Sequence, residues 1–413
     1  MKQHQKSGAR AMPSTANETA HEHKKGKRRR RLRRTIIVSV SMLLVLALGG
    51  CGWLAWWVSD VAIKPNHQFY THADHSDVVR EIKQVGAAKH VVIGSPGKYA
   101  RRQGTFGMRW DGVEATVGDV VATTAGSVER PILTGPAPSV GTTVNVTGVM
   151  ISDPRSSLGL NYSEVSVQTE LGPAPAWYIP ASGQHDSTWV IAVHGQNARR
   201  NALMAIPALH RAGMPVLAIT YRNDEGAPAS SDGLMHYGES EYRDVEAAVR
   251  YAQRKGAKRV VLYGGSMGGL IVGQFLVRSQ LANLVSATVL DSPLISMPMV
   301  AAFTGQQKGA PAPVLWATSQ IIQWRSGVDM NELDLINHPP AIKPPTLLFA
   351  GAKDTQAPLR MNRVFVAAAQ KMNWPVTYEE FPDAEHVESW NSDPARYEKA
   401  VTDFLTRTVT NSR

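Results

Sequence analysis

Residues 259–269 read RVVLYGGSMGG, and an apolar run from Leu270 to Leu276 follows them directly. The residues before the glycines are mostly apolar and β-branched, which is typical of a short buried strand, and the run after them is typical of a buried helix. Gly264 and Gly268 flank Ser266 at the junction. A serine on so sharp a turn needs small neighbours, and the helix directs its positive end at the reacting centre. The stretch therefore predicts Ser266 as a nucleophile between a strand and a helix.

Two later loops offer the acid and the base that such a serine requires. Along the chain after a strand, turn and helix of this kind, the acid comes first and the histidine follows it. Asp354 follows the apolar run from Thr346 to Ala350, and His386 follows the run from Val376 to Phe381. We expect His386 to take the Ser266 proton as general base, and Asp354 to hold the imidazole and stabilise its cation.

Each partner also has an alternative reading. Asp291 ends the preceding strand and is a rival acid, while Asp354 could instead cap the helix that follows Pro358. His386 could be an ordinary surface histidine.

An oxyanion hole needs two backbone N–H donors near the nucleophile. Met267 follows Ser266 directly at the start of the helix and supplies one of them. The second donor is expected from Gln196, in the turn His194–Asn197 behind the apolar run from Trp189 to Val193. The same turn could also be an ordinary strand end.

From about Tyr162 onward, short apolar runs alternate with helical periodicity. Such alternation buries a mostly parallel sheet between layers of helices, so we expect an α/β fold with its catalytic domain over residues 176–413. The interval of about 291–345 is long for one connection and is expected to form a cap over the carboxyl edge of the sheet. Asp393 followed by Pro394 predicts the start of the last helix.

The preceding residues, 61–175, have a different pattern. Brief β-branched runs are separated by glycine and proline, which predicts a small β-rich accessory domain. A short helix is expected at its start, roughly from Asp74 to Ala88. His67, His72 and His75 could bind a metal, but histidines in a polar linker are usually just solvated, and we expect neither a metal nor an organic cofactor.

Residues 35–58 form an uncharged apolar segment of 24 residues. At about 1.5 Å per residue, a helix of this length crosses the roughly 30 Å hydrocarbon core with some tilt. The segment predicts a transmembrane anchor with three tryptophans at its distal end, where indoles favour the headgroup region. Two alternatives are open: a cleaved signal, and a lipoprotein acylated at Cys51, because residues 48–51 read LGGC.

The net charge of +10 is confined to the segment before this anchor. Residues 1–34 hold 12 Lys/Arg and 2 Asp/Glu, and the rest of the chain carries equal numbers of basic and acidic residues. A cytoplasmic basic tail with an extracytoplasmic body follows from the positive-inside rule. The neutral body excludes nucleic-acid binding through bulk positive charge, and the single cysteine excludes an intramolecular disulfide and a multi-thiolate zinc site.

At these motifs the chain resembles the α/β-hydrolase superfamily of serine hydrolases, particularly the membrane-anchored, prolyl-oligopeptidase-like hydrolases of actinobacteria. The resemblance covers roughly residues 162–405. The matching segments are Ala192–Gly195, Thr220–Asp224, Gly264–Gly269, Asp291–Pro293, Trp390–Pro394 and, in the β-rich portion, Gly107–Gly112.

The resemblance implies an α/β-hydrolase fold with a cap insertion, a triad of Ser266, Asp354 and His386, and oxyanion donors at Gln196 and Met267. The chain departs from the family before the base, where relatives often have Gly-x-Gly-His and this chain has residues 383–386, DAEH.

We therefore expect a membrane-anchored serine hydrolase that cleaves an ester, or an amide, of a small molecule or peptide through an acyl-enzyme. An aminopeptidase or dipeptidyl-peptidase-like enzyme is the nearest alternative, and it would need acidic residues for the substrate ammonium. Candidates for that role are Asp224, Glu225, Glu239 and Glu241. A catalytically silent binding protein on the same fold is the other alternative.

Overall fold

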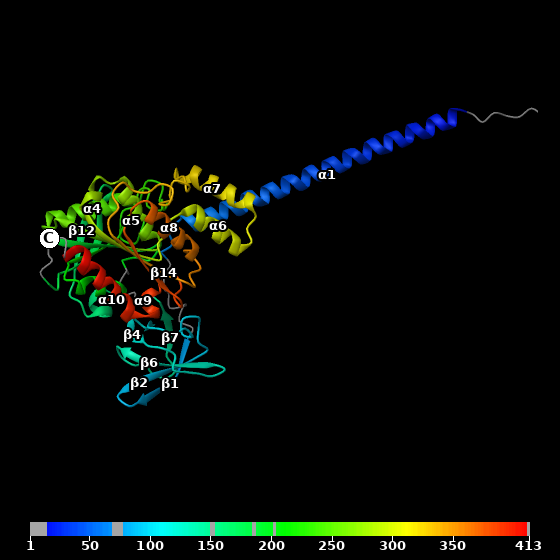
Figure 1. The fold of residues 1–413 in the computed structure, drawn as a ribbon. Coiled ribbons are helices and arrows are strands. Elements are labelled where there is room, and N and C mark those ends of the chain that lie inside the picture. Colours follow the sequence, from blue (N-terminus) through cyan, green and yellow to red (C-terminus); the bar gives the residue numbers. More distant parts are fainter. Residues whose placement is uncertain (1–14, 68–76, 149–152, 184–186, 201–203, 411–413) are drawn as a thin grey trace, which may run out of the picture.

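The computed structural model describes residues 15–67, 77–148, 153–183, 187–200 and 204–410. Within them, a long helix, a small β-barrel and an α/β domain follow one another along the chain. In Figure 1 the barrel lies below the α/β domain, while the helix projects away from the domain beside two cap helices.

The α/β domain is built on an eight-stranded sheet whose order is β15-β14-β13-β12-β10-β11-β9-β8. All pairings from β15 to β11 are parallel, and the two edge pairings at β9 and β8 are antiparallel. The strands are β8 (Ser163–Thr169), β9 (Gly172–Ile179), β10 (Thr188–Val193), β11 (Val216–Ile219), β12 (Arg259–Gly265), β13 (Val285–Asp291), β14 (Thr346–Gly351) and β15 (Val376–Phe381). The mostly parallel sheet and the α/β-hydrolase architecture are as predicted.

Helices cover both faces of this sheet because its central strands are apolar on both sides. One core joins the sheet to α4 (Tyr242–Arg254), α5 (Met267–Arg278) and α8 (Leu359–Lys371). The other joins it to α3 (Ile206–Arg211) and α10 (Pro394–Leu405). Asp393 caps α10 as predicted, because its carboxylate accepts a 3.0 Å bond from the Arg396 N–H.

The β-rich portion is an antiparallel barrel. Six strands pair in the order β2-β1-β7-β3-β4-β6, and a further pairing of β2 with β6 closes them around one apolar core. The strands are β1 (Asp77–Val85), β2 (Ala88–Gly94), β3 (Phe106–Trp110), β4 (Val113–Val117), β6 (Ser127–Thr134) and β7 (Thr143–Thr147), with β5 (Ala122–Thr123) paired to β6.

Two expectations about this portion were wrong. The predicted helix near residues 74–88 is β1, because residues 78–85 pair with β2 and residues 77 and 78 also pair with β7, and this pairing outweighs their helical propensity. The domain boundary also lies earlier than residue 175. Strand β8 and the start of β9 fall before it and pair into the eight-stranded sheet.

The helix α1 runs from Thr15 to Ile63 and contains the predicted anchor segment, residues 35–58. Its part from Arg28 to Ile63 is long and apolar enough to cross a membrane, and it lies exposed apart from its last turns. There, Ala55, Ser59 and Ile63 are buried at four-residue spacing against the α/β domain. The helix is therefore joined directly to the body of the protein.

The predicted cap consists of two helices, α6 (Met297–Lys308) and α7 (Ala312–Ser326). They lie between β13 and β14 in the chain, at the carboxyl edge of the sheet, and α7 packs along the last turns of α1. The cap and the end of α1 thus cover the edge at which strand-end loops meet.

Candidate active site

Ser266 occupies a strained turn between β12 and α5, with φ 52° and ψ −122°. A side chain at Gly268 would place its Cβ 2.3 Å from the Val193 carbonyl oxygen, and one at Gly264 would lie 2.6 Å from the Gly268 carbonyl oxygen. Only glycine fits at either position, in agreement with the expectation that so sharp a turn needs small neighbours. Ser266 consequently stands at the start of α5, above the end of the sheet.

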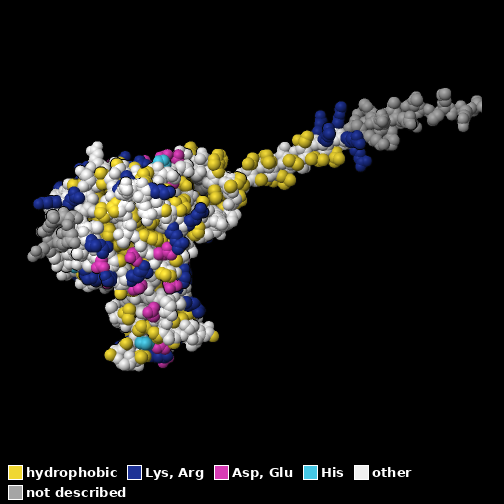
Figure 2. Space-filling model, in the orientation of Figure 1, with side chains coloured by type: hydrophobic (Ala, Val, Ile, Leu, Met, Phe, Trp, Pro, Cys, Tyr) yellow, Lys and Arg dark blue, Asp and Glu magenta, His cyan; other side chains and the backbone are white. Residues whose placement is uncertain are grey.

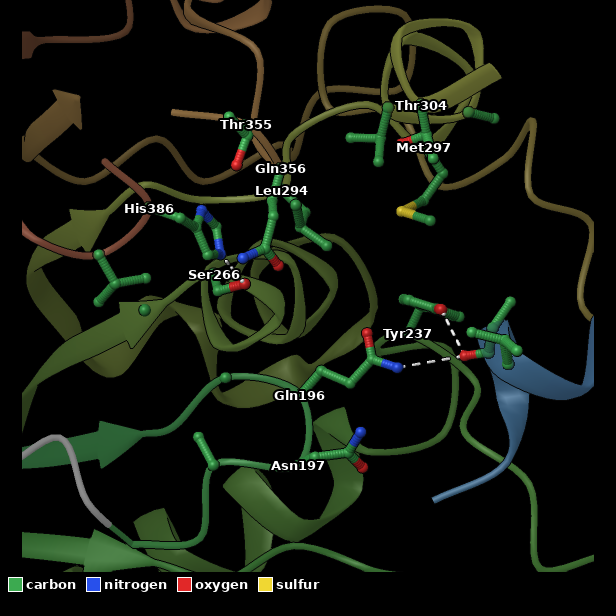
Figure 3. A pocket seen from close by; sticks show the side chains of 18 of the residues that line it. Gln196, Asn197, Tyr237, Ser266, Leu294, Met297, Thr304, Thr355, Gln356 and His386 are labelled. Atoms are coloured by element: carbon green, nitrogen blue, oxygen red, sulfur yellow. Dashed lines mark hydrogen bonds between the residues drawn. The ribbon is translucent and has the colours of Figure 1, made fainter. Parts of the chain in front are cut away.

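The structure brings Ser266, His386 and Asp354 into one row. The imidazole Nε2 of His386 lies 2.7 Å from the Ser266 hydroxyl oxygen, and its Nδ1 lies 2.9 Å from an Asp354 carboxylate oxygen. The Asp354 side chain is 1% exposed and that of His386 10% exposed. Figure 3 shows His386 directed at Ser266 on the cavity wall.

The loop around Asp354 fixes its carboxylate. Besides the imidazole, one carboxylate oxygen accepts bonds of 2.8 Å from the Gln356 N–H and 2.7 Å from the Ala357 N–H. Asp354 therefore fixes the turn that precedes α8 and also bonds His386. The alternative that it caps the helix after Pro358 was wrong, because the N-cap of α8 is Pro358 and no side chain of the described residues bonds its first turn.

The rival acid, Asp291, lies nearby without bonding the imidazole. Its carboxylate accepts a 3.2 Å bond from the Ser389 hydroxyl, and its backbone carbonyl accepts a 2.9 Å bond from the Ser266 N–H. Burial raises the pKa of the Asp291 carboxyl to about 7. The geometry thus assigns the Nδ1 side of His386 to Asp354.

Asp291 gives the stability of the fold a pH dependence that can be measured. Its pKa is about 7 when folded against an ordinary value of 3.8, so its contribution is present below about 3.8 and is lost as the pH rises through 7. Asp291→Asn cannot ionise at this position. We therefore expect the difference in melting temperature, variant minus wild type, to increase from pH 4 to pH 7 and to stay constant above pH 7.

Thermal unfolding of the full chain in detergent measures this difference, which corresponds to a few kcal/mol, since one pKa unit is about 1.4 kcal/mol. Asp111→Asn, at an exposed position, is the isosteric control and is expected to follow the wild type at every pH. Curves of Asp291→Asn that stay parallel to those of the wild type would contradict the assignment.

The two predicted oxyanion positions lie beside Ser266. Met267 is the first residue of α5, where backbone N–H groups have no partner within the helix. A Cβ on Gly195 would lie 3.0 Å from the Ser266 Cβ, so the turn that carries Gln196 packs against Ser266. The Gln196 side chain points away from Ser266 and donates a 3.2 Å bond to the Ala62 carbonyl at the end of α1 (Figure 3).

A buried pair holds this turn from below. The His194 Nε2 lies 2.9 Å from an Asp224 carboxylate oxygen, and the ring stacks on Tyr221 with centroids 4.2 Å apart. The Gly195 carbonyl lies 2.8 Å from the His194 Nδ1 and accepts a 2.9 Å bond from the Tyr221 hydroxyl. Burial alone would raise the pKa of Asp224, but the adjacent imidazole outweighs it and lowers that pKa.

Ser266 and His386 open into a cavity of about 1260 Å³. Its walls come from the cap helices α6 and α7, from the turn His194–Asn197 and from the last turn of α1. Apolar side chains line much of it; they include Val58, Leu294, Met297, Val300, Leu315 and Ile322. The space suits a ligand with a large apolar portion.

Comparison with known proteins identifies the chain. The model of the prolyl oligopeptidase family matches residues 202–412, which are about half of this chain. The matched range includes Ser266, Asp354 and His386. The chain belongs to the prolyl oligopeptidase family. A domain family of unknown function matches residues 81–147, which form most of the barrel.

Among curated proteins, the α/β hydrolase domain-containing protein WAV2 of Arabidopsis thaliana is 24% identical over 276 residues, which cover 62% of this chain and 82% of WAV2. An esterase of Pyrococcus furiosus is 25% identical, with a TM-score of 0.50 over 63% of this chain and 95% of the esterase. An acylaminoacyl peptidase of Pyrococcus horikoshii shares the fold at 14% identity and a TM-score of 0.50, over 81% of this chain and 57% of the peptidase.

This member of the prolyl oligopeptidase family is thus an α/β-hydrolase-fold serine hydrolase. The described residues contain no group of three or more His, Cys, Asp or Glu side chains that could hold a metal. Of the three linker histidines, His72 and His75 lie outside the described residues, and the His67 ring lies 3.7 Å from Asp224.

Sequence reasoning missed a contact of the barrel with the loop that carries His386. Glu385, directly before His386, forms ion pairs with Lys98 at 2.5 Å and Arg102 at 3.2 Å, and accepts a 2.9 Å bond from Thr355. Arg102 also donates a 3.2 Å bond to the Asp383 carbonyl. No local pattern could reveal this contact, because Arg102 and Glu385 are 283 residues apart.

Arg130 supports the same contact from inside the barrel. Its guanidinium is fully buried and donates bonds of 3.1, 2.6 and 2.6 Å to the carbonyls of Ala100, Arg102 and Gly104. Burial lowers the pKa of Arg130 to about 10. The barrel segment that meets the histidine loop is therefore held by a residue of strand β6.

Glu385→Gln should reveal how much the barrel contributes to holding His386. The variant loses both ion pairs but keeps the side-chain shape, and we expect kcat to fall about 10- to 100-fold with KM little changed, because small displacements of a general base are costly. Steady-state hydrolysis of a soluble ester measures it. Asp383→Asn is the control, since Asp383 is 75% exposed and its carboxylate pairs with Lys353 on the surface; equal kcat in both variants would refute the role.

Proposed function

We propose that this protein is a membrane-anchored serine hydrolase that cleaves a carboxylic ester through an acyl-enzyme, with Ser266 as nucleophile, His386 as general base and Asp354 as the acid that orients it. The observation that carries the proposal is the row of hydrogen bonds from Ser266 through His386 to Asp354 at the wall of an apolar cavity. The family membership supports the same reaction class.

In the first half-reaction, the Ser266 oxygen attacks the ester carbonyl while His386 Nε2 takes the hydroxyl proton. The backbone N–H groups of Met267 and Gln196 stabilise the oxyanion of the tetrahedral intermediate. Its collapse breaks the ester bond, and the imidazolium protonates the leaving alcohol. In the second half-reaction, a water molecule loses a proton to His386 and attacks the acyl-enzyme, which releases the carboxylic acid and restores Ser266.

The charges around the cavity support an ester rather than a substrate with a free amino terminus. None of the four acidic residues considered for the ammonium, Asp224, Glu225, Glu239 and Glu241, lies among the residues that line the cavity. Asp224 is paired with His194, and the buried Glu241 accepts bonds from the N–H groups of His236 and Gly238. No carboxylate of this set is therefore positioned to hold an ammonium.

The lining carboxylates that do face the cavity have partners. Asp60 forms ion pairs with Lys64 and Arg325, each within 2.8 Å. Glu388 pairs with Arg102, and Asp291 is buried with its pKa raised. Because these carboxylates are paired or buried, the apolar walls are the main feature for substrate recognition. The similarity to the Pyrococcus furiosus esterase also supports an ester as the substrate.

The membrane-spanning role belongs to α1. Figure 2 shows hydrophobic side chains along the exposed part of α1, bounded at its outer end by a cluster of Lys and Arg side chains. Arg28 to Arg31, Arg33 and Arg34 lie directly before the apolar segment and favour a cytoplasmic amino terminus. The catalytic domain is then extracytoplasmic. A mass measurement of the membrane-extracted protein tests the uncleaved anchor, and a lipid-modified chain beginning at Cys51 would replace it with the lipoprotein alternative.

The ester assignment is tested with two matched series: p-nitrophenyl esters of increasing acyl length, and p-nitroanilides of amino acids and dipeptides with free and blocked amino termini. We expect kcat/KM for the best ester to exceed that for every anilide by at least about 100-fold, and the preferred acyl chain to be longer than acetyl. Faster cleavage of an anilide with a free amino terminus would establish the peptidase instead.

A further inference from the structure

The cap helix α7 exposes two tryptophans on one face. Trp316 is 67% exposed and Trp324 is 75% exposed. The exposed Gln320 lies between them at a spacing of four residues on each side, so all three side chains share a face. The opposite face carries Val314, Thr318 and Ile322, which are buried. A different face of α7 packs on the core, so the two indoles are directed away from the protein. Indole side chains are enriched at membrane interfaces.

This face is fixed to the last turns of α1. The Trp324 and Trp56 rings lie 6.0 Å apart, and the Arg325 guanidinium lies 4.6 Å above the Trp56 ring. Arg325 also forms a 2.7 Å ion pair with Asp60 and donates a 2.6 Å bond to the Ser59 hydroxyl. Trp56 belongs to the end of the apolar segment 35–58. These contacts hold α7 at the depth at which α1 leaves the bilayer.

The charge of the cap suits the same surface. From Ser292 to Val328 the chain has no Asp or Glu, and its charged residues are Lys308 and Arg325. Lys308 is exposed at the end of α6. The cap segment thus contributes indoles and basic groups but no acidic group, and the nearby Asp60 is paired with Arg325, which suits anionic lipid headgroups.

We propose that the exposed face of α7, carrying Trp316, Gln320 and Trp324, is a membrane-docking surface that holds the cap in the headgroup region of the lipid bilayer beside α1. With the cap docked in this way, the cavity receives an acyl ester whose acyl chain lies in the same bilayer. The inference rests on the proposed ester hydrolysis and anchoring. Leu315 and Ile322 of α7 and Val58 of α1 line the cavity, so the elements that meet the membrane also enclose the path to Ser266.

Depth in the bilayer tests the docking without reference to activity. Cys51 is the only cysteine of the chain, so Cys51→Ala gives a background in which one introduced cysteine carries a bimane label. The full chain is reconstituted in vesicles of phosphatidylcholine and phosphatidylglycerol with brominated acyl chains, which quench the label. The labelled sites are Gln320→Cys in α7, Leu44→Cys in the middle of the anchor and Val85→Cys at the β1–β2 turn of the barrel.

We expect brominated lipid to quench the label at position 320 at least half as strongly as at position 44, and to leave position 85 unquenched. The added pair Trp316→Ser and Trp324→Ser is expected to reduce quenching at position 320 by at least half. A label at 320 that behaves like that at 85, while 44 is quenched, overturns the docking surface alone. An unquenched label at 44 overturns anchoring and docking together.

Two substrates separate docking from chemistry. For the Trp316→Ser and Trp324→Ser double variant, we expect at least a tenfold loss of hydrolysis of 4-methylumbelliferyl oleate embedded in vesicles, and less than a twofold change with soluble 4-methylumbelliferyl butyrate. Val85→Ser with Leu133→Ser, at exposed apolar positions of the barrel, is the matched control. Equal rates of the double variant and the control on the embedded ester overturn the proposal. A wild type inactive on both esters refutes the proposed ester hydrolysis, which the quenching does not depend on.

Discussion

His386→Ala is expected to lower kcat for a soluble p-nitrophenyl ester by about 10⁴- to 10⁶-fold, because the nucleophile loses the base that removes its proton and the acid that protonates the leaving group. The imidazole Nε2 lies 2.7 Å from the Ser266 hydroxyl, within reach of that proton. The residual rate should come from the oxyanion donors and substrate binding. Steady-state kinetics of the purified full chain in detergent measure the loss.

His338→Ala is the matched control. The His338 side chain is 46% exposed and lies 3.8 Å from Glu332 on the surface, far from any role in the reaction. We expect its kcat within about twofold of the wild type, and thermal unfolding should show both variants folded. If His386→Ala retained more than about a tenth of the wild-type kcat, turnover would be incidental and the silent binding protein would be the better description.

Asp354→Asn is expected to lower kcat by about 10⁴-fold while leaving the fold intact. The amide keeps the shape of the carboxyl but cannot stabilise the imidazolium, and its NH₂ group favours the wrong tautomer of His386. The bonds from the Gln356 and Ala357 N–H groups can persist on the amide oxygen, so the loop geometry survives. Steady-state kinetics of the purified variant measure the loss, and thermal unfolding checks that it is folded.

Asp291→Asn distinguishes the two acids of the site. Asp291 lies at the end of β13 and bonds Ser389, and its carboxyl is buried with a pKa of about 7. We expect its kcat within about fivefold of the wild type at pH 8. A loss larger than that of Asp354→Asn would exchange the roles of the two residues.

The strand, turn and helix around Ser266 could be predicted because its constraints are local. Gly264 and Gly268 are dictated by backbone atoms a few residues away, and the alternation of apolar runs fixes the parallel sheet. The strand-end positions of Asp354 and His386 follow from chain order and parallel topology, since all parallel strands end at one edge. For these features, sequence patterns carry nearly all the information.

Features that depend on distant pairing could not be predicted in this way. The stretch that became β1 alternates weakly and gains its strand conformation from β2 and β7. The ion pairs of Arg102 with the histidine loop, and the bond from Gln196 to Ala62 of α1, join residues that no local pattern relates. His194 and Asp224 are each recognisable in the sequence, but their pairing beside the turn that carries Gln196 emerges only in the folded chain.

Covalent labelling by a fluorophosphonate probe tests the central claim most directly. The probe requires a serine activated by an adjacent base, so the wild-type protein should be labelled, with the phosphonyl group on the peptide that contains Ser266, and Ser266→Ala should not. His386→Ala should label far more slowly than the wild type. A wild type that stays unlabelled at high probe concentration, or a label on another serine, would contradict the account.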